Sequence, residues 1–189
     1  MSEQLFDAIR TGDIAGARAS LAGGDPNARN GEGMTALMLA ASLGSLEMVQ
    51  ALIESGAEVN AIDGRGFTAL FHGCYNAEHD RGYPDVVRAL IDAGADVETR
   101  IVFGVRPLMY AAGYGEAGVV EALLEGGADP LARNEGGRTA LMMVKDKDYV
   151  DVINLLHEAE NSAGGQQSCG SRNAPDMNVI TFLKPGQKH

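Results

Sequence analysis

The chain has 189 residues, of which 45% are hydrophobic and 22% charged, the balance of one folded domain or of a short repeat array with a tail. Its two cysteines, Cys74 and Cys169, are too few and too far apart for a disulfide framework. No apolar run approaches the roughly 18 to 20 residues that a membrane span needs, and the N-terminus lacks the features of a signal peptide. We therefore expect a reducing, cytoplasmic location and no membrane contact.

The charge of the chain bears on its partners. There are 26 acidic and 15 basic residues, a formal net charge of −11. The segment 161–189 carries three basic groups and one acidic group, so the segment 1–160 holds 12 basic and 25 acidic groups, a net charge of −13. Such a surface repels phosphate backbones, which argues against nucleic acid as a ligand. It would attract a basic protein, although negative charge that only maintains solubility explains the same composition.

Two sequence markers recur in step with each other. Thr-Ala-Leu-Met or a close variant occurs at positions 35–38, 68–71, 106–109 and 139–142. The dipeptide Gly-Ala occurs at positions 56–57, 94–95 and 127–128. The step from 68 to 106 in the first marker is longer than its other steps, and the step from 56 to 94 in the second marker is longer by the same amount. Because two independent markers shift together, they indicate an internal repeat of about 33 residues with one longer copy.

One period can be assigned to local structure. The apolar residues within 35–43 share one helical face, and Gly44 can end that helix in a left-handed conformation. A second helix is predicted by the apolar stripe Leu46, Val49, Leu52 and Ile53. An extended segment follows and ends in the turn at 63–66, and we call such a segment with its turn a finger. One unit cannot bury its apolar stripe alone, so the units must stack.

This pattern resembles the ankyrin repeat, most clearly at residues 33–41 and 56–61. The resemblance covers roughly the segment 1–160 and implies an all-α solenoid of helix-turn-helix units with projecting finger loops. It divides the array into five units at about 3–29, 30–62, 63–100, 101–133 and 134–160, the first and last acting as caps. It further implies a module that binds proteins through its fingers and the concave face of its first helices, monomeric when free and without a cofactor.

The finger before the fourth unit departs from the others. It reads Ile-Val-Phe-Gly-Val at 101–105, where the preceding turns read Asn-Gly-Glu-Gly at 30–33 and Asp-Gly-Arg-Gly at 63–66. Exposed apolar residues on a loop indicate a binding site, unless the finger folds onto its neighbours and buries itself. Variable positions of neighbouring units are also apolar or aromatic. The predicted partner-binding residues, which by family geometry line one groove, are Met34, Leu43, Phe67, Tyr75, Val102, Phe103, Val105 and Tyr114.

The third unit contains the extra residues of the longer copy, within 75–84. Gly82 stands where the glycine between the two helices belongs, so the insertion lengthens either the end of the first helix or the turn after it. Insertions in repeat arrays map to loops and often to the binding face. A surface loop with no role of its own is the alternative, because lengthening a loop costs little free energy.

The same unit has a histidine at a core position. His72 replaces a leucine of the repeat and is expected near Tyr110, whose hydroxyl could satisfy the buried imidazole. A zinc or enzymatic site formed by His72, Cys74 and His79 is an alternative. These residues lack a CxxC or HxxxH pair, so the sequence favours a core histidine and predicts no metal site.

The end of the chain differs in composition from the array. Residues 161–171 are rich in Gly and Ser, as in a flexible linker, and residues 177–183 are a short apolar segment. That segment could dock on a partner or on the groove of the array, or it could remain disordered.

The function predicted from the sequence is protein binding rather than catalysis. The chain has no phosphate-binding glycine loop and no catalytic triad in motif context, so we predict no enzyme activity. We expect an inhibitor or adaptor that binds one partner protein. A bacterial immunity or antitoxin protein is an alternative that rests on analogy alone.

Overall fold

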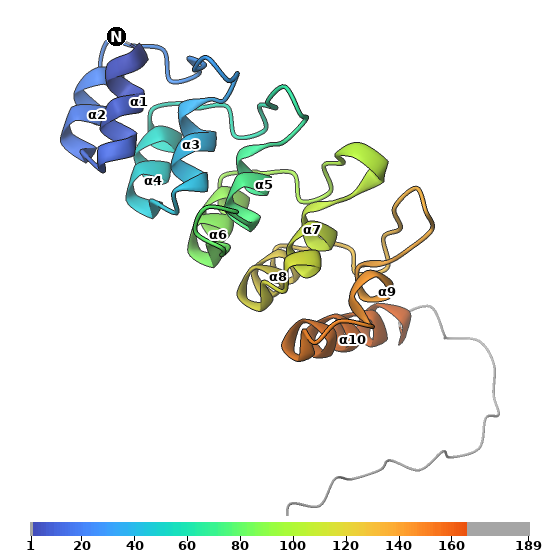
Figure 1. Ribbon diagram of the computed structural model, residues 1–189. Helices are drawn as coiled ribbons and strands as arrows, with labels where there is room; N and C mark the ends of the chain where they lie inside the picture. Colours follow the sequence, from blue (N-terminus) through green and yellow to red (C-terminus); the bar gives the residue numbers. More distant parts are fainter. Residues whose placement is uncertain (1, 166–189) are drawn as a thin grey trace, which may run out of the picture.

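The structure is a computed structural model that describes residues 2–165, and within this range the chain forms ten α-helices, one short 3-10 helix and no strand. The helices form five pairs stacked along one axis (Figure 1). The first helices are α1 (Ser2–Thr11), α3 (Ala36–Ser42), α5 (Ala69–Cys74), α7 (Pro107–Tyr114) and α9 (Ala140–Val144). The second helices are α2 (Ile14–Leu21), α4 (Leu46–Glu54), α6 (Pro84–Asp92), α8 (Ala117–Glu125) and α10 (Val150–Gly165). The predicted all-α solenoid is confirmed.

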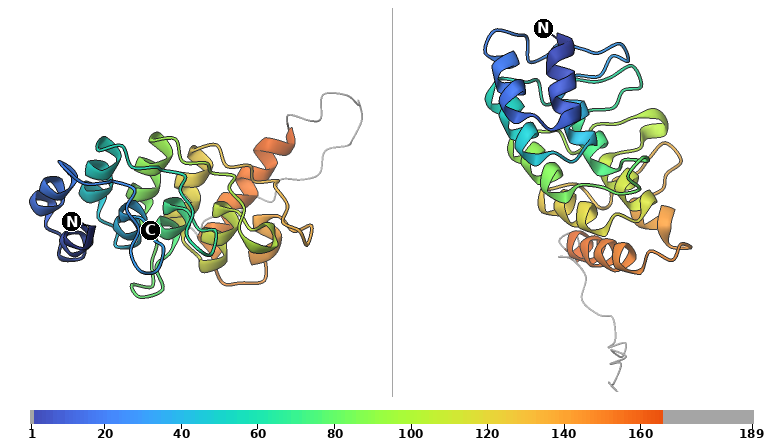
Figure 2. Two further views of the ribbon diagram at one scale, coloured as in Figure 1. Left: turned by 90° about the horizontal axis from the view of Figure 1, so that it is seen from above. Right: turned by 60° about the vertical axis from the view of Figure 1, so that its left-hand side comes forward.

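Neighbouring pairs pack first helix against first helix and second helix against second helix. Thus α3 lies between α1 and α5, and α6 lies between α4 and α8. The fingers project to one side of the stack, as two further views show (Figure 2). Inward-facing side chains form one continuous core, with fully buried leucines at Leu37, Leu52, Leu90, Leu123 and Leu156. Each such side chain contributes about 1.5–3 kcal/mol when removed from water, and the core that they form runs through all five units.

Caps determine where the first helices begin. The hydroxyl of Thr35 accepts a hydrogen bond from the backbone N–H of Met38 at 3.3 Å, and Thr139 does the same for Met142. Such an N-cap satisfies one of the free donors of the first turn. Arg106 stands at the corresponding position before α7, and that helix starts instead with Pro107, whose missing N–H leaves no free donor there.

A glycine and the ring of a tyrosine from the next unit meet at two turns between paired helices. Gly44 has φ of 69° and Gly115 has φ of 82°. A Cβ atom on Gly44 would overlap the ring of Tyr83, and one on Gly115 would lie 2.9 Å from the ring of Tyr149. Glycine is therefore required here both for the left-handed conformation and for the close approach.

Gly82, by contrast, does not play the part predicted for it. It does not adopt a positive φ, and in its turn the left-handed residue is Asp80, with φ of 50°. A Cβ atom on Gly82 would overlap the carbonyl oxygen of Cys74, so this glycine allows close packing of the backbone rather than a reversal. The helix α5 ends at Cys74, which places the whole insertion in the turn and none of it in the first helix.

The end of the array also differs from the expectation. Helix α10 continues through Gly165, so the first residues of the predicted linker are helical. The remainder of the linker and the predicted apolar segment 177–183 lie outside the described residues. None of the helices within residues 2–165 is both long and apolar enough to span a lipid bilayer.

Candidate partner-binding surface

A groove of about 300 Å³ opens between the finger turns and the first helices of units two to four. It is lined by Met34, Ser42, Leu43, Arg65, Phe67, Phe71, His72, Tyr75, Asn76, Ala77, Glu78, Tyr110 and Tyr114. Five of the eight predicted partner-binding residues are in this lining: Met34, Leu43, Phe67, Tyr75 and Tyr114. The other three belong to the finger at 101–105, which forms a separate surface.

Aromatic rings form much of the groove. Phe67 and Phe71 each meet the ring of Tyr110 edge to face, with centroids 5.6 Å apart. Tyr75 and Tyr114, from consecutive units, stack in parallel at 3.8 Å with an interplanar angle of 11°. Edge-to-face and stacked arrangements are favoured for aromatic rings, so each ring of the cluster stabilises the orientation of its neighbours.

His72 is bound by a different partner from the one predicted. Its Nε2 lies 3.2 Å from Oδ2 of Asp63 in the finger turn of the same unit, so the expected bond to the hydroxyl of Tyr110 is wrong. Asp63 also accepts the backbone N–H groups of Arg65 at 2.8 Å and of Phe67 at 2.9 Å. One carboxylate therefore shapes the finger turn and connects it to α5.

The charge states of this pair follow from their surroundings. Burial disfavours the ionised form of Asp63, but the backbone donors of Phe67 and Arg65, with His72, outweigh burial and hold the pKa of Asp63 below its usual value. Burial lowers the pKa of His72 despite the opposing attraction of Asp63. At neutral pH His72 is therefore uncharged. Because an ionised carboxylate can only accept, Nε2 of His72 carries the proton and donates to Asp63.

The insertion forms a wall of the groove through hydrogen bonds of its own. The hydroxyl of Tyr75 donates to Oδ1 of Asp80 at 2.7 Å, and Asn76 pairs with Arg81 in an isolated antiparallel bridge. The side-chain amide of Asn76 also donates to the backbone carbonyl oxygen of Ser42 in the preceding unit. Residues 76–78 thereby line the groove, so the insertion belongs to the candidate site.

The finger at 101–105 stays exposed at its tip. The side chains of Val102 and Phe103 are 63% and 72% exposed, so the finger does not bury itself on its neighbours. Val105 is half-buried and packs against the core, as Met34 and Leu43 do. Phe103 has φ of 63°, an unfavourable conformation for a residue with a side chain.

Contacts to the following finger hold this tip in place. The carbonyl oxygen of Phe103 accepts the backbone N–H of Glu135 at 3.0 Å. Arg106 lies 2.8 Å from a carboxylate oxygen of Glu98 and donates through Nη1 to the carbonyl oxygen of Arg133 at 3.0 Å. Sequence reasoning missed Arg106, although it stands where the other motif copies have threonine and that substitution was the available signal.

The suggested metal site is not formed. His72 is bound to Asp63, and His79 contacts the hydroxyl of Tyr83 through Nδ1 at 2.6 Å. Cys74 is fully buried, and burial raises the pKa of its thiol, which keeps it protonated. Within residues 2–165 no three His, Cys, Asp or Glu side chains are arranged to hold a metal ion.

A stack of helix-turn-helix units with projecting fingers defines a helical repeat protein of the solenoid class. A family model described as "Ankyrin repeats (3 copies)" matches residues 5–101 and 77–167. The chain belongs to the ankyrin repeat family. Arrays of this family generally serve as protein-binding modules rather than as catalysts.

Several ankyrin repeat proteins of other organisms are similar to this chain over the repeat region. The B-cell lymphoma 3 protein homolog of Mus musculus is 32% identical over 87% of the chain and 33% of its own length. The E3 ubiquitin-protein ligase KEG of Arabidopsis thaliana is 32% identical over 90% of the chain and 11% of its own length. Ankyrin repeat domain-containing protein 63 of Mus musculus is 33% identical over 66% of the chain and 33% of its own length. The chain thus spans a third or less of these relatives.

Proposed function

We propose that this array binds one partner protein through two surfaces, the aromatic groove and the tip of the finger at 101–105. The observation that carries the proposal is the exposure of Phe103, 72% accessible at the end of a braced loop. An aromatic side chain held in solvent in an unfavourable backbone conformation stabilises nothing within the array. Burial of such a side chain by a partner gains a few kcal/mol, the size of an ordinary interface hot spot.

The groove supplies a second anchor of the same kind. Tyr114 is 46% exposed and lies against Tyr75, so its ring is held in place yet open on the groove side. Tyrosine is enriched at interfaces because it offers a large apolar face, a polar tip and few rotatable bonds. The rings around Phe67 and Tyr110 extend the same surface.

The mode of action that we propose is binding without catalysis. His72 is occupied by Asp63 and Cys74 is buried, so we propose no catalytic role for either residue. A protein that acts by binding alone either blocks its partner or connects it to another protein, and we propose an inhibitor or adaptor of this kind in the cytoplasm, monomeric when free. The negative charge of the array supports a basic partner.

The proposal is tested by comparing how well the wild-type chain and its variants capture a partner protein from an extract. The full chain, its Phe103→Asp and Tyr114→Ala variants, and a matched Val150→Asp control are used as baits in extract from the native source. Val150 is also an exposed apolar residue, 64% accessible, but it lies at the start of α10, outside the groove lining and outside the finger at 101–105.

The expected result is a partner that is retained by the wild type and by the Val150→Asp control. Phe103→Asp and Tyr114→Ala should each weaken the affinity for that partner at least about tenfold, as loss of a hot spot does. Equal retention by all four baits would contradict the proposed surfaces.

A further inference from the structure

We infer that the groove receives an arginine side chain of the partner, which lies against the ring of Tyr75 and pairs with the carboxylates of Glu78 and Asp80. This inference rests on the proposed function and specifies the chemistry of the partner. Three features of the groove support it: the flat aromatic faces, an excess of negative charge at one end, and an equivalent contact already formed within the groove.

The aromatic faces provide the stacking surface. Tyr75 and Tyr114 stack on each other at 3.8 Å, so only the outer face of each ring can receive another group, and both rings line the groove. A guanidinium group is planar and weakly hydrated, so it stacks on such faces better than an ammonium group does. The groove shows this contact within its own chain, because the guanidinium carbon of Arg65 lies 4.9 Å from the centroid of the Phe67 ring.

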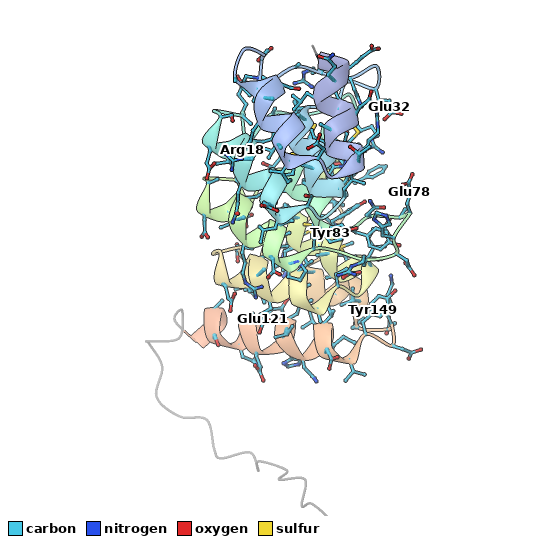
Figure 3. The ribbon with its side chains drawn as sticks, turned by 90° about the vertical axis from the view of Figure 1, so that its left-hand side faces the viewer. Arg18, Glu32, Glu78, Tyr83, Glu121 and Tyr149 are labelled. Carbon is cyan, nitrogen blue, oxygen red and sulfur yellow. The ribbon has the colours of Figure 1, made fainter. Side chains whose placement is uncertain are left out.

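The two ends of the groove differ in charge. At the finger end, the positive charge of Arg65 is balanced by Asp63, with 3.3 Å between Nη2 and Oδ2. At the other end the insertion carries Glu78 and Asp80, and Figure 3 shows Glu78 on the side of the array opposite the second-helix residues Arg18 and Glu121. The groove is therefore neutral at the fingers and negative at the insertion.

No cation of the described chain neutralises the negative end. Within residues 2–165 neither Glu78 nor Asp80 forms an ion pair. Arg81, the nearest basic residue in sequence, places its guanidinium carbon 5.3 Å from the centroid of the Tyr83 ring instead. Two carboxylates beside an open aromatic face are thus available to a cation from outside.

Negative charges also surround the hydroxyl of Tyr75. Its pKa is raised to about 12, first because its hydroxyl donates to Asp80, then by burial, and further by the charges of Asp80 and Glu116. Only the charges of Asp80 and Glu116 bear on a cation, because they make the potential at this ring negative, whereas burial disfavours a charge of either sign.

Other occupants fit this surface less well. A purely apolar side chain would cover Glu78 without replacing the water that now solvates its carboxylate, at a cost in free energy. An acidic side chain would be repelled by Glu78 and Asp80. An arginine with apolar neighbours satisfies both the rings and the carboxylates.

The test uses three capped pentapeptides and the full chain labelled with nitrogen-15. The first is acetyl-Ala-Leu-Arg-Leu-Ala-amide, and in the other two the arginine is replaced by citrulline, its uncharged analogue, or by glutamate. Titrations are followed by backbone chemical shifts. We expect saturable shifts at residues 75–80 and at Tyr114 with the arginine peptide. Affinity should fall at least about fivefold for citrulline and at least about tenfold for glutamate, the loss expected when an attractive charge is removed or reversed.

Two variants localise the effect. Glu78→Gln combined with Asp80→Asn should reduce affinity for the arginine peptide at least about fivefold, since it removes two charges and keeps the shape of the site. Asparagine tolerates the positive φ of Asp80 and can still accept the hydroxyl of Tyr75, so the loop should keep its fold. The control is Glu47→Gln, an exposed carboxylate on α4 outside the groove lining.

The inference is overturned if the citrulline or glutamate peptide binds as tightly as the arginine peptide, or if no peptide gives saturable shifts. It is also overturned if the double variant binds like the Glu47→Gln control. Failure of the proposed function is a separate outcome, because it appears as capture of a native partner that is insensitive to Phe103→Asp and Tyr114→Ala.

Discussion

Nε of Arg106 lies 2.8 Å from Oε2 of Glu98, and these two residues stand on either side of the finger turn that carries Phe103. The other carboxylate oxygen of Glu98 accepts the backbone N–H of Asp129 at 2.9 Å. Arg106 is nearly buried, so its charge depends on Glu98 for compensation. The pair thus positions the exposed tip although neither residue belongs to it.

Replacement of Glu98 by glutamine tests this brace. Glutamine can still accept the N–H of Asp129, so the change removes mainly the charge opposite Arg106. We expect the free energy of unfolding to fall by about 1–2 kcal/mol, below the cost for a fully buried pair because Glu98 is partly exposed. Urea denaturation followed by circular dichroism measures the change.

A matched control distinguishes the brace from surface charge in general. Glu121→Gln removes an exposed carboxylate that lies 3.7 Å from Arg88. Surface pairs of this kind contribute roughly 0–1 kcal/mol, so the control should lose less than Glu98→Gln. Equal losses would show that the Arg106–Glu98 pair acts as an ordinary surface pair.

The second prediction concerns the contact between Gly44 and Tyr83. Gly44→Ala adds a methyl group that overlaps the tyrosine ring in a residue whose φ is 69°. We expect a loss of about 2–4 kcal/mol, the sum of backbone strain and displacement of the ring. The control Gly56→Ala has φ of 87° but no atom within 4 Å of the added carbon, so it measures strain alone and should lose about 1–2 kcal/mol.

A double variant identifies the cause of the difference. In a Tyr83→Ala background the Gly44→Ala change should cost no more than Gly56→Ala does, since the ring that it displaces is gone. If the full cost of Gly44→Ala persists without the ring, the turn itself, rather than the contact between units, requires this glycine.

The fold was predictable because its determinants are local and repeated. The spacing of Thr-Ala-Leu-Met and Gly-Ala reports one unit after another, and stacking follows from apolar stripes that no single unit can bury. The same reasoning does not predict contacts made by loops. The bond between Asp63 and His72 requires the finger turn to fold back on α5, and no periodicity in the chain encodes that path.

The candidate site was predicted in part for the same reason. Met34 and Phe67 could be placed in one groove because they occupy equivalent positions of successive units, and Leu43 and Tyr114 also occupy equivalent positions. Val105 occupies the position equivalent to Met34 and Phe67, but it does not line the groove, and its place in the binding surface stays a prediction. The role of Gly82 depends on its close approach to the backbone of Cys74 and that of Arg106 on its contact with Glu98, and the local sequence shows neither.

The third prediction concerns the dependence of stability on pH. Burial lowers the pKa of His72 below its ordinary value of 6.5, so the unfolded chain binds a proton more readily than the folded chain does. Stability is therefore highest above the unfolded pKa and declines as the pH falls below it. His72→Leu should stay folded at neutral pH, because Asp63 keeps its bonds to Arg65 and Phe67.

The measurement compares both proteins in urea at about pH 7.5 and about pH 5, above the range in which carboxylates titrate most strongly. The wild type should lose more stability on acidification than His72→Leu. The opposite sign, a wild type that gains stability relative to the variant at the lower pH, would show that the attraction of Asp63 exceeds the effect of burial on His72.

The last prediction separates the stability of the finger from its use. Phe103 adopts φ of 63°, a conformation that glycine accepts without strain. Phe103→Gly should therefore leave the free energy of unfolding unchanged or raise it by up to about 1 kcal/mol, because relief of strain offsets the greater freedom of the unfolded chain. It should also weaken partner binding at least about tenfold, since the exposed ring is removed. The control is Glu32→Gly at the same turn position of an earlier finger, where φ is not positive and the variant should lose about 0.5–1 kcal/mol. Calorimetric melting and titration with the captured partner measure the two quantities on the same samples. A large loss of stability in Phe103→Gly with binding intact would show that the ring supports the array, and the interface would then be confined to the groove.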